Sequence, residues 1–153
     1  MTFNEVEYAL PNGLHDSEVS SILVDYVQRT VIMQLSVFVG QLDASPEQRE
    51  AYKEGSLIIS GLLFLVVEPP DSRYPFTKPA SLRIDTCDMR KNLDPALLAA
   101  LPKEAFVKSF FVKEWNAFVH VAGLSAEISW KDQGTITYRK QREHLLPGEI
   151  MEL

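Results

Sequence analysis

The chain has 153 residues, of which 46% are hydrophobic and 24% are charged, as is typical of a globular protein. This length fits one domain over residues 1–153, with a core large enough to fold without a disulfide or a metal. The formal net charge is −6, and residues 1–68 carry ten acidic but only three basic residues. Because such a surface repels phosphate, we expect no nucleic-acid partner.

The cysteine content and the N-terminus both predict a cytoplasmic protein. Cys87 is the single cysteine, and one thiol forms neither an internal disulfide nor a cysteine zinc site. The carboxylates of Asp85 and Asp88 should raise its pKa, which predicts a structural thiol. Residues 1–10 lack the basic start and apolar stretch of a signal peptide. The most apolar run, Leu57–Val67, is too short for a membrane-spanning helix, which needs about 20 residues.

The first half of the chain predicts a β-hairpin over Glu18–Val39, after a turn at Pro11–Gly13. Alternation places Ile22 and Val24 on one face of the first strand and Val19 and Leu23 on the other. The expected core residues of the hairpin are Ile22, Val24, Leu35 and Val37.

Two further elements are predicted before residue 70. Ser45 can cap a short helix in which Pro46 takes the first position and Gln48 completes a capping box, and Gly55 would end that helix. The alternative is a fraying connector, because the segment is short and highly charged. The apolar run within Ser56–Glu68 is predicted to be a buried strand or strand pair, which ends because the prolines that follow it supply no ladder donor.

The second half predicts mostly strands. A proline-rich loop over 69–79 leads to a strand at Ser81–Thr86, and Asp94 then begins a short helix. The last third predicts a meander whose final two strands pair across a turn at 131–134. Residues 143–153 have no pattern and are expected to form a loose tail. The predicted meander strands are Phe106–Lys113, Asn116–Val121, Ser125–Trp130 and Thr135–Tyr138.

Together these elements predict a mainly β domain, with α+β as the alternative. The expected architecture is an antiparallel sandwich or open barrel of about seven or eight strands with one or two short helices. A parallel sheet would need a crossover helix between strands, and the strand spacing leaves no room for such helices.

The sequence contains no phosphate-binding glycine loop, nucleophile elbow or zinc-protease motif, so we expect no cofactor and no bound metal. His15 and Asp16 are the first candidate site, because imidazole titrates near neutral pH and a carboxylate fixes its tautomer. Neighbouring residues reach one site only from a turn, and these two follow the turn at Gly13. The alternative is that Asp16 or Ser17 caps the turn through backbone hydrogen bonds. His120 is a third catalytic candidate, which would join them if the first hairpin meets the meander.

Three aromatic residues near predicted loops, Tyr74, Phe76 and Trp115, are candidates for partner binding. The alternative is that these side chains cap the core.

A resemblance to a known group of proteins covers residues 13–68. Gly13–Ser17, with Ile22, Val24–Tyr26 and Arg29–Thr30 after it, resembles the opening hairpin of small uncharacterised bacterial proteins, some of which are similar to toxin-neutralising immunity proteins. A second segment is similar at Tyr52, Gly55, Leu57, Gly61 and Glu68. The resemblance brings no catalytic residues with it.

The resemblance implies a non-catalytic module that binds a protein partner with a basic surface through the acidic first half. One alternative is a small metal- or ligand-dependent enzyme that uses His15, Asp16 and His120. Another is a structural homo-oligomer whose subunits pair through a sheet edge or the C-terminal tail.

Overall fold

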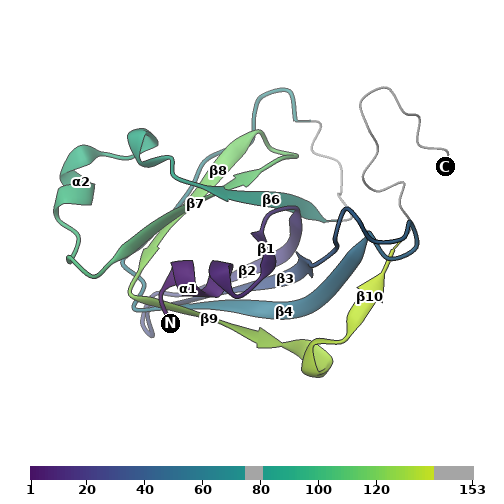
Figure 1. Ribbon diagram of the computed structural model, residues 1–153. Helices are drawn as coiled ribbons and strands as arrows, with labels where there is room; N and C mark the ends of the chain where they lie inside the picture. The colour runs from purple at the N-terminus through teal and green to yellow at the C-terminus, as the bar shows by residue number, and fades with distance from the viewer. Residues whose placement is uncertain (75–80, 140–153) are drawn as a thin grey trace.

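The chain folds mainly into β-structure, as predicted, with 46% of it in strands and 14% in helices (Figure 1). The computed structural model describes residues 1–74 and 81–139. Phe76 and the predicted tail at 143–153 lie outside these ranges. The described elements are α1 (Phe3–Tyr8), β1 (Pro11–Leu14), β2 (Ser17–Asp25), β3 (Thr30–Phe38), β4 (Ala51–Ser60), β5 (Phe64–Val67), β6 (Leu82–Cys87), η1 (Arg90–Asn92), α2 (Pro95–Ala99), β7 (Phe106–Val112), β8 (Ala117–Gly123), β9 (Ser125–Trp130), η2 (Lys131–Gly134) and β10 (Ile136–Tyr138).

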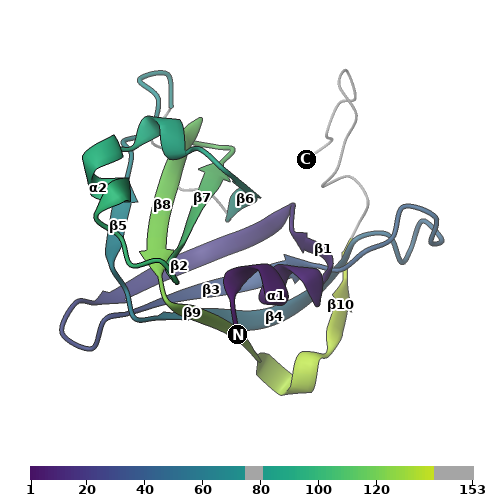
Figure 2. The same cartoon turned by 60° about the vertical axis from the view of Figure 1, so that its left-hand side comes forward.

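Nine of the described strands form one antiparallel sheet, which is not closed into a barrel. Its order is β10-β4-β3-β2-β6-β7-β8-β5, and β9 pairs with β4 beside β10. The sheet folds over on itself. β2, β3, β4 and β9 form one layer, and β6, β7 and β8 form the other (Figures 1 and 2). Every strand pair is antiparallel, so the described sheet contains no parallel pair that would need a crossover helix.

The core fills the space between the two layers, and α1 closes its open side (Figure 2). Thr2 caps α1 in a capping box with Glu5, and the helix buries Phe3 and Val6. Phe3 contacts the rings of Phe106 and Phe110. The sequence pattern predicted no helix or strand in this short N-terminal segment, which nevertheless contributes Phe3 and Val6 to the core.

The predicted hairpin forms as β2 and β3, and it contains a β-bulge. Val19 pairs with Leu35, but Ser21 pairs with Gln34, so Ser20 is the extra residue. The bulge shifts the alternation by one position and brings Val19 to the same face as Ile22, although the sequence placed them on opposite faces. Val19 and Leu35 are buried, and Ile22 is half-buried against the core.

The helix predicted from Ser45 does not form. Turns occupy the residues before Ala51, and β4 begins there. β4 pairs with β3 over nine consecutive positions, from Thr30↔Ser60 to Phe38↔Tyr52. The cap signal is local, and these long-range pairings outweigh it because each adds backbone bonds and buried apolar surface.

The structure decides one strand prediction and corrects another. Ser56–Glu68 forms two strands rather than one: β4 ends at Ser60, Gly61 takes a positive φ of 65°, and β5 begins at Phe64. β9 and β10 do not pair with each other, because both pair with β4. The other predictions hold closely, with β6, β7 and β8 near their expected bounds and α2 capped by Asp94.

Within the described part of the chain, no helix is long and apolar enough to cross a membrane.

Candidate functional site

The turn between β1 and β2 brings His15 and Asp16 together at the surface, as the sequence predicted. The His15 amide donates to the Asn12 carbonyl at 3.1 Å, and Asp16 takes a left-handed conformation with φ of 57°. Aspartate tolerates this region better than most residues do. The turn lets two adjacent side chains lie on one side of the sheet.

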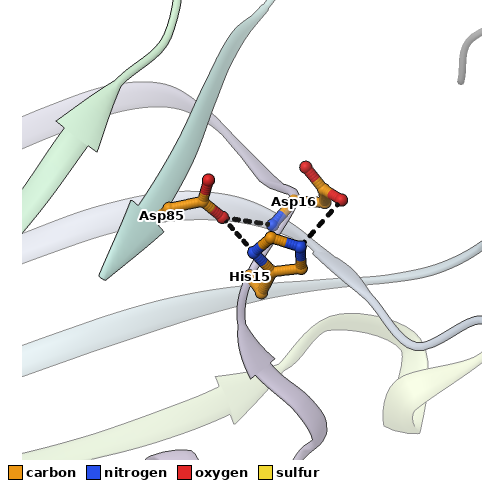
Figure 3. Close-up of side chains that lie close together, drawn as sticks. All are labelled: His15, Asp16 and Asp85. Atoms are coloured by element: carbon orange, nitrogen blue, oxygen red, sulfur yellow. Dashed lines mark hydrogen bonds and ion pairs between the residues drawn. The ribbon is translucent and has the colours of Figure 1, made fainter. Parts of the chain in front are cut away.

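Asp85 of β6 completes this group (Figure 3). Its Oδ1 atom accepts from the Asp16 amide at 3.1 Å and forms an ion pair with His15 Nδ1, while His15 Nε2 lies 3.2 Å from Asp16 Oδ2. Pairing of Ser17 with Ile84 places Asp85 beside the turn. Lys113 contacts both carboxylates, and we call the four residues His15, Asp16, Asp85 and Lys113 the β1–β2 turn cluster.

Lys113 determines what this cluster can do. Its Nζ atom forms an ion pair with Asp16 Oδ1 and lies 3.3 Å from Asp85 Oδ2. Desolvation is the largest single influence on the pKa of Lys113, and it lowers that pKa. The hydrogen bonds to Asp16 and Asp85 and the negative charges of these two residues raise it, and together they outweigh desolvation. The pKa of Lys113 therefore lies above its ordinary value, and the ammonium stays charged.

The His15, Asp16 and Asp85 ligand atoms lie within 4.8 Å of one another, which is close enough for one divalent cation. Lys113 already supplies the positive charge that such a cation would bring to the carboxylates. The geometry therefore favours an ion-pair cluster that fixes the turn. The sequence did not point to Asp85 or Lys113 as members of this cluster, because no local motif connects them to the turn.

His120 is not part of this cluster and lies instead on β8 in the core. It is 0% exposed, its Nδ1 atom lies 2.8 Å from Ser109 Oγ, and its Nε2 atom lies 2.7 Å from Glu68 Oε2. Glu68 Oε1 also accepts from the Phe118 amide at 3.0 Å. Desolvation, the largest influence, raises the pKa of Glu68, but the His120 and Phe118 hydrogen bonds bring it below its ordinary value.

The hydrogen bonds run from a serine through a histidine to a carboxylate, as they do in a hydrolase triad. The solvent exposure of the serine and of the acid is the reverse of that in a triad. A triad presents its serine to substrate and buries its acid. Here Ser109 is 1% exposed, whereas the Glu68 side chain is 28% exposed. Because no substrate can reach the Ser109 hydroxyl, this chain of hydrogen bonds serves to satisfy a buried histidine.

The aromatic candidates Tyr74 and Trp115 lie at one loop junction. The Asp71 amide donates to the Trp115 carbonyl at 2.8 Å, and the Tyr74 amide donates to the Asp71 carbonyl at 2.8 Å. Trp115 packs against the edge of the core, so its indole is only half exposed. Phe76 lies outside the described residues.

Cys87 is half-buried, and its pKa is raised by burial and by Asp85 and Asp88, in the direction predicted from the sequence. A raised pKa disfavours the reactive thiolate.

A group of exposed apolar side chains that the sequence analysis did not single out lies at the end of the β2–β3 hairpin. Leu23, Tyr26 and Val27, at the end of the β2–β3 hairpin, are 65%, 70% and 89% exposed. We call these three residues the hairpin tip. In the sequence these residues look like the continuation of a strand. Alternation already places Leu23 opposite Ile22 and Val24, but it does not show that Tyr26 and Val27 lie in solvent beyond the strand.

Comparisons with models of known families, with curated proteins and with solved structures found no match. The resemblance to immunity proteins stays a prediction.

Proposed function

We propose that the protein is a non-catalytic protein-binding module of the immunity-protein kind, and that the hairpin tip is its docking element. The exposed apolar surface of the tip carries the proposal. Three large apolar side chains within five positions, all more than 60% exposed, expose surface that a bound partner would bury favourably. The hairpin also extends beyond the layers around it (Figure 2), so a partner can reach it.

The strand edge beside the tip supports the same role. β2 pairs with β6 only from Ser17 to Val19. Within the described ranges, residues 20–25 therefore have a strand partner on the β3 side alone. An open edge of this kind can accept a strand from a partner protein, whose main chain would supply the missing hydrogen bonds.

Charge indicates what kind of partner would bind. A net charge of −6 attracts a basic protein and speeds its encounter. Two acids of the first half do not contribute to this surface: Glu18 and Glu50 are buried, where Arg139 contacts Glu18 and Tyr52 donates to Glu50. The exposed acids of that half lie on several elements, so steering would come from the whole molecule.

The test begins with the genes beside the one that encodes this chain, where we expect a basic toxin domain. We expect co-expression of the chain to neutralise the toxin, and the purified proteins to bind each other. Replacing Tyr26 and Val27 together by serine should weaken binding by at least about tenfold, since buried aromatic anchors dominate interface energies.

Leu42→Ser is the matched control, because Leu42 is also 89% exposed but lies outside the hairpin, before β4. It should bind the toxin as wild type does. Equal binding by the hairpin variant would contradict the proposal, as would failure of the wild-type chain to neutralise any adjacent toxin. A dimer in solution that the hairpin variant loses would instead assign the edge to a second copy of the chain.

A further inference from the structure

A cavity of about 480 Å³ lies between α1 and the inner face of β4, β9 and β10. Its volume falls within the range of small-molecule sites, about 300–1,000 Å³. Most of its walls are apolar. They include Val6, Leu10, Val39, Ile128, Trp130 and Ile136.

Lys53 brings a charge into this cavity from the core-facing side of β4. Side chains alternate along a strand, so Lys53 shares its face with Leu57 and Ile59, which are both 0% exposed. It pairs in register with Ile136, another residue of the cavity wall. The other residues on this face of β4 are apolar or glycine. A half-buried lysine among them loses part of its hydration, and that cost has to be offset by a favourable contact.

The ammonium of Lys53 lies 4.4 Å from the centre of the Trp130 ring. Among the described residues, no carboxylate lies within ion-pair distance of it. An aromatic face offsets part of the cost of removing a cation from water, but an anion offsets more.

Two glycines make room for this arrangement. A Cβ atom on Gly55 would lie 2.9 Å from Trp130 Cε3, so the indole can rest against β4 only because Gly55 has none. A Cβ atom on Gly134 would lie 2.7 Å from Lys53 Cε, and Gly134 has a positive φ of 76°. The chain therefore leaves space for both side chains at the same end of the cavity.

We propose that this cavity binds a small amphipathic anion, namely a medium-chain fatty acid. Its carboxylate would pair with Lys53 and lie within reach of Gln41, and its hydrocarbon chain would lie between α1 and Trp130. The apolar walls fit the hydrocarbon chain, and the Lys53 ammonium, which no described carboxylate pairs, fits one carboxylate. This role is separate from protein binding by the hairpin tip.

Decanoate is the probe, and decanol is the neutral ligand of the same chain length. The chain has two tryptophans, so a Trp115→Phe background leaves Trp130 as the reporter in the full-length protein. Titration with decanoate should give a saturable change in Trp130 fluorescence. Binding of decanol should be at least about tenfold weaker, since it lacks the charge-assisted bond to Lys53.

Lys53→Met keeps the apolar stem and removes the charge, so it should weaken decanoate binding to the level of decanol and leave decanol binding unchanged. Lys103→Met, at an exposed position outside the cavity, should change neither. Ala9→Phe adds bulk at an exposed wall position and should abolish binding of both ligands without unfolding the chain.

Equal affinity of wild type for decanoate and decanol would overturn the proposal, as would the absence of a saturable change. A Trp130 signal that depends on protein concentration but not on decanoate would overturn it too, and would indicate that a second chain occupies the cavity.

Discussion

At the scale of single residues, Asp85 does the most to hold the β1–β2 turn cluster together. It accepts the Asp16 amide, pairs with His15 and contacts Lys113. The Asp16 amide belongs to a residue with positive φ, so the turn needs a fixed acceptor at this point. We therefore expect the cluster to hold the turn in place without a bound ion.

Replacing Asp85 by alanine should destabilise the protein by about 1–3 kcal/mol, because it leaves the Asp16 amide without this acceptor and removes a charged partner of Lys113. Asp85→Asn should cost less, since its amide oxygen can still accept from Asp16. Urea unfolding of both variants measures the difference.

The metal alternative predicts a different result from the same measurement. If the cluster is a structural ion-pair network, excess Zn²⁺ should leave the unfolding midpoint of the wild-type chain unchanged. A Zn²⁺-dependent rise in that midpoint, lost in Asp85→Ala, would make the cluster a metal site.

At the scale of elements, the β2–β3 hairpin has two distinct faces. On β3, Val31, Met33, Leu35 and Val37 are each at most 2% exposed and face the core. On β2, the bulge at Ser20 changes which residues face inward, and Leu23 is left in solvent. The hairpin therefore packs into the core through β3, whereas Leu23 on β2 stays exposed to solvent.

Leu35→Ala should cost about 2–5 kcal/mol of unfolding free energy, as deletion of buried leucine atoms does elsewhere. Leu23→Ala is the control on the same hairpin, and it should change stability by less than about 0.5 kcal/mol because Leu23 is exposed. Chemical denaturation of the two variants provides the comparison. A small loss for Leu35→Ala would mean that the register of the hairpin is wrong.

At the scale of the whole molecule, the two layers are joined by strands that bend. The chain passes from β4 to β5 at Gly61 and from β8 to β9 at Gly123. β4 pairs with β9, and β5 pairs with β8, so the two bends lie together. A Cβ atom on Gly123 would lie 2.7 Å from Ile59 Cγ2, which shows how tightly the junction is packed.

Gly123→Val should therefore destabilise the whole fold by about 1–3 kcal/mol, the usual cost of overpacking a core. Gly123→Ala should lose less. Ser129→Val, which adds a β-branched residue at an exposed position of β9, should change stability little. Thermal unfolding monitored by circular dichroism would test the series, and a Gly123→Val protein as stable as wild type would show that the junction can relax.

The sequence by itself determined the features that depend on near neighbours. Period-two alternation identified the hairpin, the meander strands and hence the mainly β class, because strand side chains alternate regardless of what packs on them. The turn chemistry before His15 indicated that His15 and Asp16 could share a site. Asp94 identified the start of α2 through its capping side chain.

Only the tertiary structure decided what depends on distant residues. Asp85 is 69 residues from Asp16, and Lys113 is 97 residues away, so strand pairing alone brings them to the turn. The cap signal at Ser45 is local, but pairing with β3 made the segment from Ala51 a strand and turned Lys53 toward the core. The physical reason is the same in both cases: local propensities differ by about 1 kcal/mol or less per residue, whereas long-range pairing and burial act on whole strands together.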